Sequence, residues 1–117
     1  MKNLIIVTGG AGFVGSNLIE LLLKKTKYKI LSIDNYSSGL KKNHIKNKRL
    51  KYIKGHTKNI TKLLASKKKK IKVIFHFGEF SRIYQSFLKM NDCINSNMIG
   101  SNEVFNFCLL NKIKLIY

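Results

Sequence analysis

The sequence of 117 residues contains no proline, no tryptophan, two cysteines and only five acidic residues. No apolar run approaches the roughly 20 residues that a membrane-spanning helix needs, so nothing indicates insertion in a membrane. The apolar stretch near the start covers residues 4–7, which is too short for the core of a secretory signal. With 44% hydrophobic residues, a chain of this length suits one soluble domain, and we expect it in the cytoplasm.

The scarcity of cysteine and the placement of histidine also exclude some kinds of site. Cys93 and Cys108 lie fifteen residues apart in one predicted helix, about four turns from each other, so they cannot form a disulfide together. This use of cysteine fits a reducing compartment. The three histidines, His44, His56 and His76, show no metal-ligand spacing, and we predict no metal site.

The shortage of acids leaves a formal net charge of +18. Such a charge can indicate a nucleic-acid or anionic-membrane partner, because lysine neutralises phosphates. However, all but two of the 23 basic residues are lysine, whereas arginine is the residue that reads bases and phosphates with a fork. Lysine scattered beside many asparagines and isoleucines favours a compositional bias, and we expect neither a nucleic-acid nor a membrane partner.

Strand-like and helix-like segments alternate along the chain. We predict strands at residues 4–7, 30–33, 52–53, 73–77 and 113–116, and helices at residues 14–25, at 60–66 and from 91 onward. In the last helix, one stripe at helical spacing is expected to face the sheet: Ile94, Met98, Ser101, Phe105 and Cys108. Such alternation predicts an α/β fold, a Rossmann-type doubly wound parallel sheet with ligands beyond the carboxyl ends of its strands.

A glycine-rich loop follows the first predicted strand, in the stretch IIVTGGAGFVGSNLIELL at residues 5–22. Its spacing fits both G-x-x-G-x-x-G (Gly9, Gly12, Gly15) and G-x-G-x-x-G (Gly10, Gly12, Gly15), so spacing alone leaves the register open. Gly9 allows a tight turn, Gly12 lets the backbone approach a pyrophosphate, and Gly15 lets the helix pack close to the strand. The free amides at the helix start, around Phe13 and Val14, then face the phosphates.

An aspartate supports this interpretation. Asp34 ends the second predicted strand, 19 residues after Gly15. A carboxylate at that place accepts both hydroxyls of the adenosine ribose and repels a 2′-phosphate, which favours NAD over NADP.

The segments VTGGAGFVGSNL, DNYSSG, VIFHFGEFSRIYQS and NSNMIGSNEVFNF resemble the extended short-chain dehydrogenase/reductases, and among them the NAD-dependent nucleotide-sugar epimerases and dehydratases similar to UDP-glucose 4-epimerase. The resemblance covers residues 2–117, in the order and at the spacings of the family. It implies that Asp34 and Asn35 hold the adenosine ribose, with Ser38 and Gly39 beside it. It implies further cofactor contacts from Phe77, Gly78 and Asn97, and it suggests a homodimer.

Some residues depart from the family pattern. The family usually has G-D-[IVL] after the third strand, its Asp bonding the adenine amine, whereas this chain has Gly55, His56 and Thr57. A neutral imidazole can accept that bond, so we keep His56 and Thr57 among the cofactor-binding residues. Glu79 brings a carboxylate close to the expected cofactor path, and we include it among the cofactor-binding residues; the alternative is that it faces the substrate or a lysine. We interpret His76 as a packed residue at a strand end.

The catalytic Ser or Thr and the Tyr-x-x-x-Lys of the family have no counterpart here, because no tyrosine is followed four residues later by lysine. We therefore assign no catalytic residue and expect residues 1–117 to be the N-terminal portion of an NAD(P)-binding Rossmann domain, in the front part of a longer epimerase or dehydratase that acts on a nucleotide sugar. The alternatives are a non-catalytic NAD-binding module or truncated relative without turnover and, from another class, a basic nucleic-acid binder.

Overall fold

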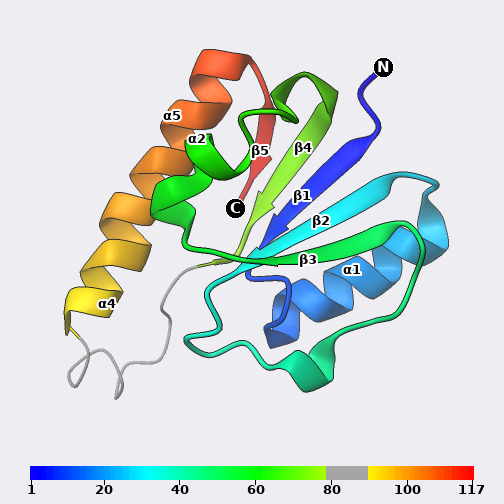
Figure 1. The fold of residues 1–117 in the computed structure, drawn as a ribbon, viewed down its shortest axis with the longest axis horizontal. Helices are drawn as coiled ribbons and strands as arrows, with labels where there is room; N and C mark the ends of the chain where they lie inside the picture. The colour runs from blue at the N-terminus through cyan, green and yellow to red at the C-terminus, as the bar shows by residue number, and fades with distance from the viewer. Residues whose placement is uncertain (79–89) are drawn as a thin grey trace.

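The computed structural model describes residues 1–78 and 90–117, which form a five-stranded parallel sheet in the order β3-β2-β1-β4-β5. The strands are β1 (Leu4–Thr8), β2 (Lys29–Asp34), β3 (Leu50–Lys54), β4 (Ile71–His76) and β5 (Lys114–Ile116). After β3 the chain crosses back over β1, so that β4 pairs with the other side of β1 (Figure 1). The winding therefore reverses at the carboxyl ends of β1 and β4, as the predicted doubly wound sheet requires.

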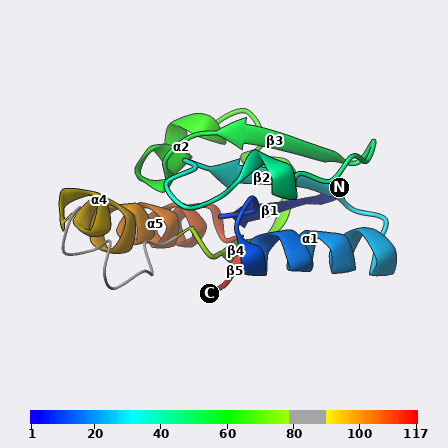
Figure 2. The ribbon, with the colours of Figure 1, turned by 90° about the horizontal axis from the view of Figure 1, so that it is seen from below.

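Helices cover both faces of the sheet. In Figure 2 the strands lie between α1 (Phe13–Lys25) and α2 (Ile60–Leu63). Along β1 the side chains alternate between two core clusters: Ile5 and Val7 pack with Ile19 of α1, whereas Leu4 and Ile6 belong to the cluster that includes α2 and α5 (Ser101–Asn111). Burial on both faces explains why the strand at residues 4–7 is apolar throughout.

The predicted elements are confirmed, with differences at their ends. The predicted helix at residues 60–66 is shorter as α2, and 3-10 turns at Thr57–Asn59 and Lys68–Lys70 flank it. The helix predicted from residue 91 comprises α4 (Met90–Ile94), a π-helical turn (Asn95–Gly100) and α5.

The predicted stripe on this last helix is wrong at three positions. Ile94, Met98 and Phe105 are exposed, and the residues that α5 buries are Ser101, Val104, Phe107 and Cys108. The stripe assumed one uniform helical period, but a π-helical turn holds more residues than an α-helical turn and shifts the register of the residues after it.

Within residues 1–78 and 90–117, every helix is too short or too polar to reach across a bilayer. Cys93 lies in α4 and Cys108 in α5, and both are free thiols. The Cys108 side chain is buried, and this burial raises the pKa of its thiol to about 11.

Candidate functional site

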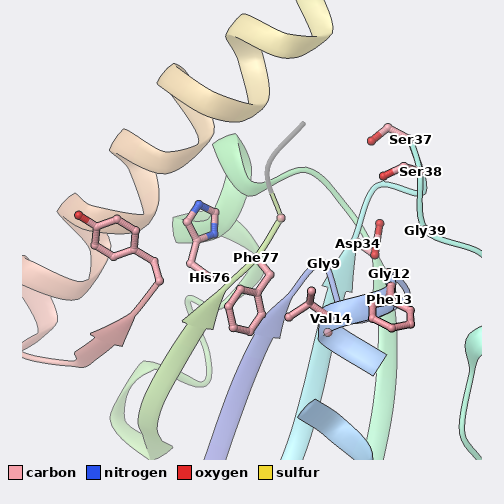
Figure 3. A pocket seen from close by; sticks show the side chains of 13 residues that line it. Gly9, Gly12, Phe13, Val14, Asp34, Ser37, Ser38, Gly39, His76 and Phe77 are labelled. Carbon is pink, nitrogen blue, oxygen red and sulfur yellow. The ribbon is translucent and has the colours of Figure 1, made fainter. Parts of the chain in front are cut away.

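A cavity of about 540 Å³ lies beyond the carboxyl ends of β1, β2 and β4 (Figure 3). Three segments form most of its wall: the glycine loop with the start of α1, the end of β2 with the loop after it, and the end of β4. The lining residues are Gly9, Gly12, Phe13, Val14, Gly15, Asp34, Ser37, Ser38, Gly39, His76, Phe77, Gly78 and Tyr117.

Two glycines of the loop are required by the packing of the protein itself. Gly9 has a φ of +74°, and a Cβ there would lie 2.8 Å from the carbonyl carbon of Phe77. A Cβ on Gly15 would overlap the carbonyl oxygen of Gly9 and would lie 2.8 Å from the Cα of Gly10. These close approaches bring β1, the end of β4 and α1 together around the loop.

Gly10 and Gly12 differ in what surrounds them. A Cβ on Gly10 would overlap the Ser32 hydroxyl of β2, so Gly10 faces the sheet and does not line the cavity. A Cβ on Gly12 would meet only the Gly9 carbonyl oxygen, at 3.3 Å, and would otherwise stand in open space. The cavity is therefore lined by Gly9, Gly12 and Gly15, the first of the two patterns that the spacing allowed.

The start of α1 presents backbone donors to the cavity. Gly12 is the N-cap of α1, and no side chain caps this end of the helix. The first amides of an α-helix have no intrahelical partner and carry the positive end of the helix dipole. Because Gly12, Phe13 and Val14 all line the cavity, this end of the cavity favours an anion.

Asp34 provides a buried carboxylate beside the glycine loop (Figure 3). Its side chain is 8% exposed, and its two oxygens accept hydrogen bonds from the Ala11 amide (3.0 Å) and the Tyr36 amide (2.8 Å). Gly39 lies directly against it, because a Cβ on Gly39 would be 2.6 Å from Asp34 Oδ2. Burial and the nearby Asp34 and Tyr52 raise the pKa of the Tyr36 hydroxyl.

The loop after β2 is fastened to the glycine loop and to β3. Ala11 contributes its carbonyl oxygen, which accepts from the Leu40 amide (3.0 Å) and from Asn43 Nδ2 (2.8 Å). The Tyr36 hydroxyl is hydrogen-bonded to His44 Nε2 (2.7 Å), and the His44 ring stacks on Tyr52 with centroids 3.7 Å apart. These contacts fix the segment that carries Ser37, Ser38 and Gly39 at the rim of the cavity (Figure 3).

A buried chain of hydrogen bonds lies beneath the cavity. Thr8 Oγ1 accepts from the amides of Phe77 (3.0 Å) and Gly78 (2.9 Å), so its hydroxyl proton is directed to His76 Nδ1 (2.6 Å). His76 Nε2 then carries the ring proton and donates to Ser101 Oγ (2.8 Å). His76 is 2% exposed, which confirms its interpretation as a packed residue.

Most of the predicted cofactor-binding residues meet at this cavity. Ten of them line it: Gly9, Gly12, Phe13, Val14, Gly15, Asp34, Ser38, Gly39, Phe77 and Gly78. Asn35 and Thr57 line a small adjoining cavity of about 20 Å³, and within the described part of the chain the buried Thr57 hydroxyl has no hydrogen-bond partner.

Neither His56 nor Asn97 lines either of these cavities. His56 caps the 3-10 turn at Thr57–Asn59, with its Nδ1 accepting from the Lys58 amide (3.1 Å), so this nitrogen is already engaged as an acceptor. Asn97 lies in the π-helical turn, and its Nδ2 contacts Cys93 Sγ (3.6 Å). Glu79 lies outside the described residues.

Sequence reasoning missed Ser37, His76 and Tyr117 among the lining residues. Ser37 is the immediate neighbour of a predicted residue. Tyr117 directly follows β5, and the rule that ligands lie beyond the carboxyl ends of strands was a signal that pointed to it.

Comparisons with known proteins identify relatives of this chain in sequence and in structure. A family profile described as the NAD dependent epimerase/dehydratase family matches residues 5–117. A protein named dTDP-D-glucose 4,6-dehydratase from Dictyostelium discoideum is 31% identical over 117 residues, which cover 94% of this chain and 27% of that protein. A protein named uncharacterized UDP-glucose epimerase YtcB from Bacillus subtilis is 38% identical over 90 residues, covering 70% of this chain and 28% of its own length.

Among solved structures, the enzyme WbmG of Bordetella bronchiseptica in complex with NAD superposes with a TM-score of 0.81 at 27% identity. The match covers 96% of this chain and 36% of that one. The chain thus spans little more than a quarter of the length of the curated relatives that it matches.

Proposed function

The chain belongs to the NAD-dependent epimerase/dehydratase family, and from that premise we propose that it binds NAD as the cofactor-holding part of a nucleotide-sugar epimerase or dehydratase. One observation carries the proposal: a bare glycine loop, an uncapped helix start and a buried carboxylate line a single cavity. The NAD complex of WbmG supports the choice of cofactor, and the names of the curated relatives support the substrate class.

The diphosphate of NAD fits the glycine-loop end of the cavity. Gly12 has no side chain and has open space around its Cα, so a phosphate can come into contact with the backbone there. The amides at the start of α1 supply hydrogen-bond donors and a positive dipole end.

The adenosine ribose fits the Asp34 wall. A carboxylate offers about four lone-pair sites, and the amides of Ala11 and Tyr36 use two of them. The others remain for two ribose hydroxyls. A 2′-phosphate would place a second negative charge against the buried carboxylate, so we propose NAD in preference to NADP.

The adenine base of NAD fits beside the small cavity that Asn35 and Thr57 line. His56 Nδ1 already accepts a hydrogen bond from the Lys58 amide, and in a neutral imidazole the other nitrogen is a donor. The buried Thr57 hydroxyl is a better candidate to accept from the adenine amine. We therefore favour Thr57 over His56 as the polar contact of the base.

When bound, NAD supplies hydride transfer at a sugar carbon. The residues of this chain bind and orient the cofactor, and we assign none of them a catalytic role because the sequence contains no Tyr-x-x-x-Lys. The departures from the family pattern at His56 and Glu79 keep a non-catalytic NAD-binding module as the second candidate. The homodimer suggested by the resemblance stays a prediction.

Titration of NAD and NADP by calorimetry tests the proposal. We expect NAD to bind at least roughly tenfold more tightly than NADP, a difference of about 1.4 kcal/mol. Asp34→Asn should weaken NAD binding and reduce this preference. The matched control is Glu20→Gln, which also removes one carboxylate but is exposed on α1 and does not line this cavity. Equal affinities for NAD and NADP in the unchanged chain would contradict the proposal.

A further inference from the structure

A second cavity, of about 620 Å³, is lined by residues at the amino ends of the strands. Figure 1 shows these strand ends at the edge of the sheet opposite to the carboxyl ends, where the first cavity lies. The residues before and at the start of β1, β2, β3 and β4 form its wall. The apolar residues that line it are Met1, Leu4, Ile30 and Leu31. The two cavities share no lining residue.

Basic side chains dominate the rim of this second cavity. They come from three separate parts of the chain: Lys29 on β2, Lys48, Arg49 and Lys51 around the start of β3, and Lys67, Lys69 and Lys70 before β4. Among the described residues, no acidic side chain lines it. A concave site lined by charges of one sign concentrates the field and attracts ions of the opposite sign.

Arg49 is the rigid member of this set. Its guanidinium donates to the carbonyl oxygens of Leu23 (2.6 Å), Thr26 (2.9 Å) and Tyr28 (2.9 Å), where α1 ends and β2 begins. A guanidinium has five N–H donors, and these bonds use three of them. Arg49 is therefore held in one orientation beside the cavity and keeps two donors for a further partner.

We propose that this second cavity binds a compact polyanion that carries two or more phosphate groups. Lysines act as mobile point charges for phosphate, and a fixed guanidinium adds a directed contact. The cavity volume lies in the range of small-molecule sites. No aromatic side chain lines the cavity in the described part of the chain, so it offers no platform for stacked bases, and this favours a small phosphorylated ligand over RNA.

Inorganic tripolyphosphate, titrated into the full chain by calorimetry, is the probe. The triple variant Lys67→Gln, Lys69→Gln, Lys70→Gln should weaken its binding roughly tenfold, because three charges on one wall are removed. The control triple variant Lys58→Gln, Lys62→Gln, Lys114→Gln removes the same net charge from residues that line neither cavity. It should leave the affinity unchanged.

A second variant from another wall, Lys48→Gln with Lys51→Gln, should also weaken binding, while NAD binding at the first cavity stays the same in all variants. Equal loss in the control triple variant would show that tripolyphosphate senses only the diffuse charge, and this would overturn the proposal. Absence of binding to the unchanged chain would overturn it too. The proposal would also be overturned if a short single-stranded RNA bound more tightly than tripolyphosphate and its binding depended on the same lysines.

Discussion

Gly15→Ala tests whether the glycine loop is a packing requirement of the fold. The new methyl group would overlap the Gly9 carbonyl oxygen and crowd the Gly10 Cα, and neither backbone atom can rotate away. Overpacking of this kind costs up to about 3 kcal/mol, and the better helix propensity of alanine within α1 returns about 1 kcal/mol. We therefore expect a net loss of about 2 kcal/mol, which lowers the Tm by about 8 °C.

Gly12→Ala is the matched comparison, because it adds the same methyl group three residues earlier. Gly12 has φ −85° and ψ 179°, a conformation open to alanine, and the new Cβ would stand 3.3 Å from a single atom. We expect the free energy of unfolding to stay within about 1 kcal/mol of the parent. NAD affinity should fall at least roughly tenfold, because the methyl group occupies the place where the diphosphate meets the backbone.

Urea unfolding followed by circular dichroism measures the first effect, and calorimetric titration with NAD measures the second. The two variants should separate: Gly15→Ala loses stability, whereas Gly12→Ala loses mainly affinity. A Gly15→Ala protein as stable as the parent would refute the close contact between α1 and the loop. Unchanged NAD affinity in Gly12→Ala would refute the placement of the diphosphate.

Four further predictions concern three residues outside the glycine loop. Arg49→Met should lower the free energy of unfolding by about 2 kcal/mol, because three backbone carbonyls lose a half-buried charged donor. In the same urea titration, the control Lys48→Gln should change the free energy of unfolding little. Nitrogen chemical shifts from NMR should show His76 as the Nε2–H tautomer, and the Nδ1–H form would contradict the hydrogen-bond directions described here. The pKa of about 11 at Cys108 implies about 100-fold less thiolate than an ordinary thiol near pH 8, so iodoacetamide followed by mass spectrometry should label Cys93 well before Cys108. The pKa of the Cys108 thiol is higher in the folded chain than in the unfolded chain. The contribution of this thiol to stability is therefore present below about pH 9 and is lost as the pH rises to about 11. Urea unfolding at a series of pH values measures this loss.

The sheet was predictable from the sequence because each strand carries its own local signal. Short apolar runs such as residues 4–7 and 30–33 are followed closely by glycine or aspartate. This pattern predicted strands without knowledge of any contact. The helix stripe was not predictable in the same way. The π-helical turn at Asn95–Gly100 changes the helical period, and nothing in the spacing of apolar residues indicates where a turn will widen.

The same distinction holds for the site. The glycine loop and Asp34 are visible in the sequence because spacing and position define them. The use of His56 Nδ1 by the Lys58 amide depends on local geometry, and the contacts of Arg49 join residues 21 to 26 positions apart. Periodicity contains no information about such distant side-chain contacts, so the role of Arg49 emerged only from the structure.

Asp34 also sets a limit on protein engineering. Its carboxylate holds the amides of Ala11 and Tyr36, so it fastens two loops together as well as facing the cavity. An attempt to convert the cofactor preference by substituting this residue alone would loosen the scaffold at the same time. A redesign would do better to keep the aspartate and vary the exposed Ser37 and Ser38, which line the rim without joining those two loops.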